Sequence, residues 1–178
     1  MPGRPELLIM CGLSFSGKTT LAREISERYH CPVISLDAMN AHGRLNSGEG
    51  ALDSEWRKAH ASALEGLDGL MQKKTPMIII DDNSCLRFLR DNYRYVANRY
   101  GYKVHTVLLD TPMDMIHARR REGLEYRDRV SDAVFEEHCR GFQWPEAEEK
   151  PLTFRHGSDP EVWMHEHFLN PCVEASVA

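Results

Sequence analysis

The sequence predicts an α/β fold in which a five-stranded parallel sheet is flanked by helices on both faces. Short apolar runs alternate with amphipathic runs along the chain, a pattern typical of parallel strands joined by right-handed helical crossovers. The first apolar run leads directly into Gly12–Thr19, which has the pattern G-x-x-x-x-G-K-T and opens an amphipathic run. With 178 residues and no visible linker or repeat, residues 1–178 are expected to form a single domain.

Five short runs are expected to form the strands. Leu7–Cys11 is wholly apolar, and Met77–Asp82 opens with four apolar residues, as strands buried on both faces of a parallel sheet do. Val33–Leu36 predicts a shorter strand and Lys103–Leu109 a longer one. Leu152–Phe154 is expected to be a short fifth strand.

Helical periodicity accounts for the segments between these strands. Helices are expected over about 18–30, 54–74 and 86–100, ended by Cys31-Pro32, by Thr75-Pro76 and by Gly101. The second of them carries one apolar stripe, formed by Trp56, His60, Ala63, Leu64, Leu67 and Met71.

Further helices are expected after the fourth strand. Pro112 opens one, Ser131 or Asp132 begins another that ends near Gly141, and Asp159-Pro160 caps the last. The packing face of that last helix is predicted to consist of Val162, Trp163, His167 and Phe168.

Composition excludes several classes of protein. The longest apolar runs are too short to cross a bilayer, so a cytoplasmic protein is expected. A net charge of −5 gives no general attraction to nucleic acid or to an anionic membrane. The 5 cysteines are scattered without a C-x-x-C pair, which argues against a disulfide framework and a cysteine zinc site. His165–His167 is interpreted as a solvated helix face and not as a metal site.

Gly12–Thr19 has the residue types of a phosphate-binding loop. Gly12 and Gly17 let the backbone wrap so that several N–H groups converge on one phosphate. Lys18 places a cation on the outer phosphates, and Thr19 offers a hydroxyl to Mg²⁺ at the positive end of the following helix. The residues predicted to bind the nucleotide are Gly12, Ser14, Ser16, Gly17, Lys18, Thr19 and Thr20, with Arg120 from a lid.

Carboxylates follow two of the predicted strands. Asp37 ends the second strand in the same crevice as the phosphate loop, where it can accept the proton of an alcohol aligned with the γ-phosphate. The alternative is that Asp37 only caps the next helix. Of Asp81 and Asp82, one is expected to support Mg²⁺; Asp82 is preferred because it lies further toward the carboxyl end of its strand, and Asp81 remains the alternative.

Two loops complete the predicted site. Residues 40–53 carry three glycines and little apolar periodicity, so an exposed acceptor loop is expected over about 40–54. An arginine-rich lid is expected over about 117–131, where Arg120 or a neighbouring arginine delivers positive charge to the transferring phosphoryl group. Any one of these arginines can instead belong to a solvated helix face. The acceptor pocket is predicted to consist of Asp37, Asn40, Trp56, Arg57, Asn83 and Arg87.

The residues that accompany the loop favour a kinase. No Asn-Lys-x-Asp element of a guanine-specific switch is present. The third strand is followed by Asp82-Asn83-Ser84, without the glutamate with which a motor ATPase activates water. Transfer to a hydroxyl is therefore favoured over transfer to water.

On these motifs the chain resembles a known group, the small P-loop kinases related to zeta toxins, to the kinase domain of polynucleotide kinases and to antibiotic O-phosphotransferases acting on chloramphenicol and capuramycin. The similar segments are GLSFSGKTTLAREI, VISLD, IIIDDNS, LRFLRDNYR and HARRR, within about residues 7–155. The resemblance implies a P-loop NTPase fold, Asp37 as general base, Lys18 and Thr19 on phosphate and metal, and lid arginines on ATP. Asn40 stands where polynucleotide kinases have an arginine three residues after the base, which favours a neutral small-molecule acceptor.

The sequence therefore predicts an ATP- or GTP-dependent, Mg²⁺-requiring phosphotransferase that acts on a small-molecule alcohol such as an antibiotic or a nucleoside-like compound. Asp37, Lys18 and Arg120 are the predicted catalytic residues, and the protein is expected to be a monomer or homodimer without nucleic-acid or membrane partners. Two alternatives remain: a polynucleotide 5′-hydroxyl kinase, and a regulatory module that binds nucleotide without catalysis.

Overall fold

The computed structural model of the chain describes residues 4–36, 51–82, 84–122 and 132–168. Within these ranges the strands are β1 (Glu6–Cys11), β2 (Val33–Ser35), β3 (Met77–Asp81), β4 (Lys103–Asp110) and β5 (Leu152–Arg155). They form one parallel sheet in the order β2-β3-β1-β4-β5, which confirms the predicted fold class. Each strand differs from its predicted bounds by one residue at one end.

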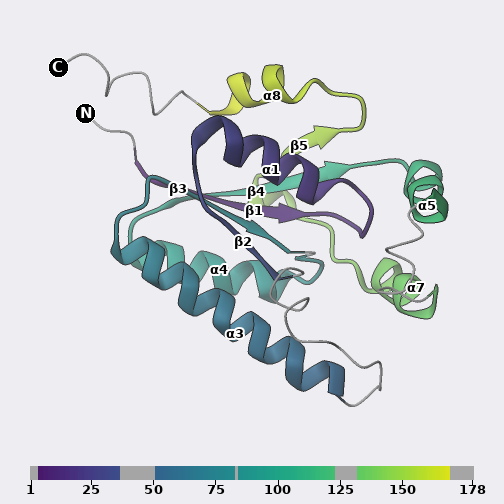
Figure 1. Ribbon diagram of the computed structural model, residues 1–178, viewed down its shortest axis with the longest axis horizontal. Helices are drawn as coiled ribbons and strands as arrows, with labels where there is room; N and C mark the ends of the chain where they lie inside the picture. Colours follow the sequence, from purple (N-terminus) through teal and green to yellow (C-terminus); the bar gives the residue numbers. More distant parts are fainter. Residues whose placement is uncertain (1–3, 37–50, 83, 123–131, 169–178) are drawn as a thin grey trace.

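Two pairs of helices cover the two faces of the sheet (Figure 1). On one face lie α1 (Lys18–Tyr29) and α8 (Pro160–His167), and on the other lie α3 (Ala51–Gln72) and α4 (Arg87–Arg99). Successive β3 residues divide between two apolar clusters, since Met77 and Ile79 pack with α1 whereas Ile78 and Ile80 pack with α3 and α4. The alternation of side chains along a strand explains this division.

Two further helices lie beyond the carboxyl ends of the strands (Figure 1). These are α5 (Met113–Glu122) and α7 (Asp132–Gly141), and a short 3₁₀ helix, η1 (Ala147–Glu149), follows them. A third apolar cluster joins them to the phosphate loop, because Leu13 is buried together with Ile116 of α5 and Phe135 of α7. The ring of Phe15 also contacts the ring of Phe135 edge-on, with 6.2 Å between centroids.

The helix predicted from about Ser54 begins at Ala51, and its stripe faces the sheet with His60, Ala63, Leu67 and Met71 buried. The order of strands places the loop after β1 at a switch point, because the chain runs to β2 on one side of β1 and to β4 on the other. Ligands bind at such points outside the carboxyl ends of parallel strands.

The prediction for the last helix was wrong at one position. Val162 is 56% exposed, whereas Trp163, Met164 and Phe168 are buried against α1. A helix of 8 residues presents a narrow contact face, and here that face is centred on Trp163. His165 and Glu166 are exposed, as expected of a solvated helix face. No group of three potential metal ligands occurs among the described residues. Within the described residues, every helix is too short or too polar to span a bilayer.

Candidate functional site

The phosphate loop depends on two glycines for different reasons. Gly17 has φ 102°, a left-handed conformation that residues with a Cβ adopt at a cost. A Cβ on Gly12 would lie 2.8 Å from the Oγ of Ser16 and 3.3 Å from the Cβ of Leu109, so the backbone is packed too closely there for any side chain. Of the four residues between them, Phe15 also has a positive φ, 67°. The loop is therefore a fixed, tightly curved turn.

Lys18 begins α1 at the end of this loop. Its side chain is almost buried, and its Nζ donates a hydrogen bond to the carbonyl oxygen of Leu13, 2.9 Å away. The ammonium group is thus held over the loop, where an outer phosphate of a bound nucleotide would meet it. Thr19 and Thr20 are exposed in the first turn of the same helix.

A cavity of about 570 Å³ opens beside the loop. One end is lined by Ser14–Leu21 and Glu24, and the other by the turn between β5 and α8. The lining residues there are Phe154 of β5, His156, Gly157 and Ser158 of the turn, and Pro160, the first residue of α8. The sequence-based predictions did not include this turn, because nothing in its composition distinguishes it from an ordinary strand-to-helix connection. Its role appears only when β5 is placed next to β4.

Arg119 of α5 reaches the phosphate loop. Its Nη1 donates to the carbonyl oxygens of Phe15 and Ser16, at 3.1 and 3.0 Å, and it also lines the cavity. Arg120 points elsewhere, since it forms an ion pair with Asp132 and stacks over the ring of Phe135, with 4.5 Å from Cζ to the ring centroid. Among the lid arginines within the described residues, Arg119 is the one in contact with the loop.

Asp81 and Asp82 face opposite sides of the sheet. Asp81 is 5% exposed and, by strand alternation, follows Met77 and Ile79 on the α1 face, the face of Thr19. Asp82 is half-buried on the other face, where its Oδ2 accepts a hydrogen bond from the hydroxyl of Tyr93, 3.4 Å away. The geometry therefore favours Asp81, the alternative in the sequence-based prediction, on the side of the phosphate loop.

Arg87 is engaged by acidic residues of another segment. Its guanidinium pairs with Glu146, 2.6 Å away, and with Glu148. It does not line the cavity at the phosphate loop. The structure therefore does not bring Arg87 to the loop. Arg57 lies on α3 with its side chain exposed. Neither position tests a role in binding an acceptor, so both remain predictions.

Arg90, which lies close to Arg87 in the sequence, forms a buried ion pair with Glu149. Arg90 is fully buried and donates through Nε and Nη2 to both carboxylate oxygens of Glu149, at 2.8 and 2.7 Å. Its Nη1 also donates to the carbonyl oxygens of Ser84 and Gln143, at 2.8 and 3.0 Å. These bonds fix the segment that follows β3 against the segment that follows α7. Although burial opposes it, hydrogen bonding to Arg90 and Arg94 lowers the pKa of Glu149 to about 2.

His138 of α7 is a further residue that the sequence-based predictions omitted. Its Nδ1 is buried without a hydrogen-bond partner among the described residues. Burial lowers the pKa of His138, and the positive charge of nearby Lys18 lowers it further while Glu137 opposes both. A neutral imidazole therefore lies on the lid side of the phosphate loop.

Several predicted site residues lie outside the described part of the chain. These are Asp37, Asn40 and Asn83, together with the acceptor loop up to residue 50 and the lid from residue 123 to 131. The side chain of Trp56 also lies outside it.

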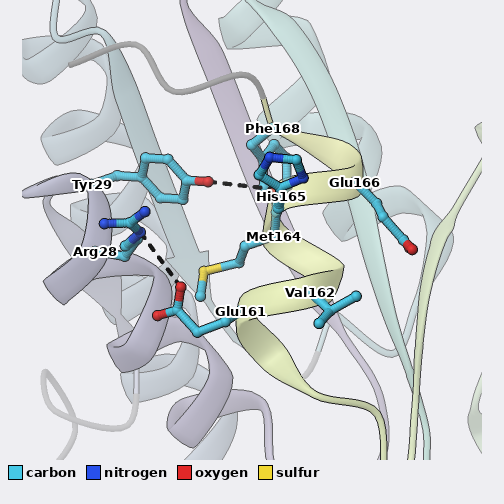
Figure 2. A pocket seen from close by; sticks show the side chains of 8 residues that line it. All are labelled: Arg28, Tyr29, Glu161, Val162, Met164, His165, Glu166 and Phe168. Carbon is cyan, nitrogen blue, oxygen red and sulfur yellow. Dashed lines mark hydrogen bonds and ion pairs between the residues drawn. The ribbon is translucent and has the colours of Figure 1, made fainter. Parts of the chain in front are cut away.

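A second cavity, of about 400 Å³, lies between α1 and α8 (Figure 2). Arg28 and Tyr29 line it from the far end of α1, about 15 Å along the helix from Lys18 at 1.5 Å per residue. Arg28 pairs with Glu161 across it, 3.6 Å apart, and the hydroxyl of Tyr29 donates to the carbonyl oxygen of Met164. This cavity is thus separate from the phosphate loop.

Comparison with known proteins agrees with this geometry. Residues 7–145 match the AAA_33 family, described as an AAA domain, from β1 to the segment that follows α7. The chain belongs to the AAA_33 family. The match includes the phosphate loop, the acidic residues Asp81 and Asp82 at the end of β3, and the arginines of α5.

A curated relative is more distant. The chain is 29% identical over 128 residues to a 2′,3′-cyclic-nucleotide 3′-phosphodiesterase of Mus musculus, which covers 71% of this chain. The chain spans 29% of the length of the curated relatives it matches. The similarity is therefore to a part of those proteins.

Several solved structures, kinases among them, share the fold. A putative kinase from Chloroflexus aurantiacus superposes on this chain with a TM-score of 0.75 at 18% identity. The match covers 94% of this chain and 100% of the kinase chain. A sugar kinase from Janibacter has a TM-score of 0.67 at 19% identity, covering 91% of each chain. Kti12 of Chaetomium thermophilum, solved with ADP-AlF3, has a TM-score of 0.67 at 17% identity and covers 90% of this chain and 94% of its own. The fold is thus that of the P-loop kinases.

Proposed function

We propose that this chain is a nucleoside-triphosphate-dependent kinase that transfers the γ-phosphoryl group to a hydroxyl of a small molecule. The observation that carries the proposal is the buried Lys18 ammonium at one end of a cavity that continues to the turn after β5. A cavity of about 570 Å³ suits a mononucleotide, since pockets for small ligands measure about 300–1,000 Å³.

The phosphate end of the cavity supplies positive charge from three sources. The curved loop and the N-terminal first turn of α1 line the same cavity, and Lys18 and Arg119 border it. When a phosphoryl group passes from donor to acceptor, negative charge spreads over its oxygens, and fixed positive groups stabilise that charge. Arg119 takes the place that was predicted for Arg120.

The other end of the cavity suits the base of the nucleotide. The side chains of Phe154 and His156 offer flat surfaces, and Gly157 has φ 83° with nothing within 4 Å of the position of a Cβ, so the turn leaves open space. We assign the base to this turn. Because flat side chains and open space do not distinguish the two purines, both ATP and GTP are candidate donors.

Oxygen donors near the loop fit a magnesium ion. Thr19 carries a hydroxyl in the first turn of α1, and Asp81 carries a carboxylate at the end of the neighbouring strand on the same face. Hard cations such as Mg²⁺ prefer oxygen ligands of this kind. When bound, the ion would neutralise charge on the outer phosphates. In this proposal Asp81 replaces Asp82 as the carboxylate on the metal side.

The acceptor is proposed to bind on the opposite side of the loop. Asp37 follows β2, whose last residue Ser35 lies opposite Asp81 in the sheet. A carboxylate there accepts the acceptor's proton as the new O–P bond forms. Asn40, Asn83, Trp56 and Arg57 are proposed to shape the pocket around it. The sugar kinase among the structural neighbours supports a small hydroxylated acceptor, with antibiotics and nucleoside-like compounds as the first candidates.

The proposal is tested by nucleoside diphosphate release from ATP and GTP with Mg²⁺ across a panel of hydroxylated antibiotics, nucleosides, sugars and a 5′-hydroxyl oligonucleotide. Lys18→Met and Asp37→Asn are assayed in parallel. Release that requires one small acceptor and is abolished in both variants supports the proposal. Release that requires the oligonucleotide favours a polynucleotide kinase, and tight nucleotide binding without any transfer favours a regulatory module.

A further inference from the structure

A chain of buried polar side chains leads away from Asp82. Tyr93 of α4 is fully buried, and its hydroxyl lies 3.4 Å from Oδ2 of Asp82 and 3.2 Å from Nδ1 of His60. His60 belongs to α3, and its Nε2 lies 3.4 Å from Nδ2 of Asn92. Three elements of the fold, β3, α3 and α4, thus meet through side-chain hydrogen bonds at this one point.

The direction of these hydrogen bonds follows from the chemistry of the groups. An ionised carboxylate only accepts, so the single proton of the Tyr93 hydroxyl is donated to Asp82. The hydroxyl oxygen then accepts from Nδ1–H of His60, and Nε2 of His60 accepts from the amide of Asn92. Burial lowers the pKa of His60 and raises that of Tyr93, so both groups are neutral near pH 7.

The surroundings of these hydrogen-bonded side chains are otherwise apolar. Tyr93 packs in the cluster formed by residues of β1, β2, β3, α3 and α4, among them Ile34, Leu67 and Ile80. A phenylalanine would fill the position of the ring without burying a hydroxyl, and a buried polar group without a partner costs about 1–3 kcal/mol. Fully connected polar groups in a core instead fix one arrangement of their members. Here the member that directly follows β3 is Asp82.

These hydrogen-bonded side chains lie on the side of the site where the acceptor is proposed to bind. Asp82 faces α3 and α4, away from the face on which α1 carries Lys18 and Thr19. His60 lies in α3, the helix that follows the predicted acceptor loop of residues 40–54. A carboxylate in a fixed orientation at this place can accept a hydrogen bond from a hydroxyl of the acceptor.

We propose that Tyr93 and His60 are positioning residues that hold the Asp82 carboxylate in the orientation in which it binds a hydroxyl group of the acceptor. The inference rests on the proposed kinase function and adds to it a second carboxylate for the acceptor, in addition to the predicted base Asp37. The site therefore selects acceptors with at least two hydroxyl groups, one that is phosphorylated and one that Asp82 orients.

The kinetic test compares Tyr93→Phe with Tyr102→Phe. Tyr102 is also buried in this cluster, and its hydroxyl donates to the carbonyl oxygen of Thr75, 2.6 Å away, which precedes β3 at the other end of the strand. Both variants thus lose one buried hydroxyl. With the panel alcohol that the wild type phosphorylates, Tyr93→Phe should lower kcat/KM for the acceptor by about tenfold or more, because misplacing one group has effects of that size. KM for ATP should stay within about twofold of wild type in both variants.

A spectroscopic test on the nucleotide-free protein needs no acceptor. ¹⁵N-histidine NMR should place the His60 proton on Nδ1, and Tyr93→Phe should shift that resonance whereas Tyr102→Phe should not. His60→Asn offers an amide N–H close to the position of Nδ1, whereas His60→Gln offers one close to Nε2, so Asn should retain more acceptor kcat/KM than Gln. Thermal unfolding of all four variants separates a loss of function from a loss of folding.

Distinct results overturn the two proposals. If the wild type phosphorylates an acceptor and Tyr93→Phe keeps acceptor kcat/KM within about twofold, or if the His60 proton lies on Nε2, this inference is wrong and the kinase function stands. If no acceptor in the panel is phosphorylated by the wild type, the proposed function fails and the inference fails with it, even where the NMR result agrees with the hydrogen-bond chain.

Discussion

The guanidinium of Arg119 lies 3.0 Å from the carbonyl oxygen of Ser16, so that α5 is bonded directly to the phosphate loop. The same oxygen also accepts from the hydroxyl of Thr111, 2.8 Å away. These contacts place a permanent positive charge at the loop before any ligand binds. They also fix the start of the lid relative to Lys18.

Arg119→Ala should lower kcat/KM for the nucleotide by about 10- to 100-fold, because it removes a cation from the site of developing charge. Arg120→Ala should have a smaller effect, since Arg120 pairs with Asp132. Arg121 is exposed at the end of the same helix, and Arg121→Ala is the control. Steady-state kinetics of the three variants measure these changes in kcat/KM. If Arg120→Ala lowers kcat/KM more than Arg119→Ala does, Arg120 is the catalytic arginine, as predicted from the sequence.

Gly17→Ala should weaken nucleotide binding by about 100-fold or more, because a left-handed conformation strains a residue with a Cβ and the added methyl would lie 3.3 Å from Nη1 of Arg119. Gly69→Ala is the matched control. Gly69 lies within α3, and nothing lies within 4 Å of the position of its Cβ, so alanine there should stabilise the helix by about 0.5–1 kcal/mol. Isothermal titration with ATP measures the first effect and chemical unfolding the second. Equal ATP affinity in the two variants would contradict this account of the loop.

Glu149→Gln should lower the free energy of unfolding at pH 7 by about 3 kcal/mol, because it removes the charge that compensates the buried Arg90. Arg90 and Arg94 hold the pKa of Glu149 at about 2, below its ordinary value of 4.5. The charged form is therefore stabilised by folding. Its contribution is complete above about pH 4.5 and is lost as pH falls through about 2.

Urea unfolding from pH 7 to pH 2 measures this dependence. The difference between wild type and Glu149→Gln should narrow steadily below pH 4.5, and Glu166→Gln, at an exposed position of α8, should show no comparable difference at any pH. A difference that stays constant down to pH 2 would mean that the ion pair does not determine the stability of this segment.

His156→Ala should raise KM for ATP by about five- to tenfold and leave kcat unchanged, because contacts with the base are the same in the ground state and the transition state. His165→Ala, at an exposed position of α8 beside the second cavity, is the control. A fall in kcat with unchanged KM would show that the turn acts on the reacting phosphate and not on the base.

The sequence was sufficient for features that depend on local chemistry. The phosphate loop is a contiguous motif, and each strand is a short contiguous segment that is mostly apolar or alternates with helical segments, so the five-stranded parallel sheet could be predicted without tertiary information. The choice between Arg119 and Arg120 could not, because adjacent residues of a helix point about 100° apart and only the packing of α5 decides which one meets the loop. Strand alternation places Asp81 and Asp82 on opposite faces, but only the packed fold shows which of the two faces is that of the phosphate loop.

Features formed by distant segments were missed. The turn at His156 lines the cavity with Ser14, although 142 positions separate the two in the chain. The contact of Arg87, whose predicted role in the acceptor pocket remains a prediction, with Glu146 depends on how the segment after α7 returns across α4. No local pattern encodes either contact.

The fate of the γ-phosphoryl group tests the central claim most directly. ³¹P NMR of ATP, Mg²⁺ and an acceptor panel with the wild-type protein should show a phosphate monoester that grows as ADP grows, in equal amounts, with Lys18→Met forming neither. If inorganic phosphate alone accumulates, or if ATP binds and remains intact with every acceptor, the chain is not a kinase of small-molecule alcohols.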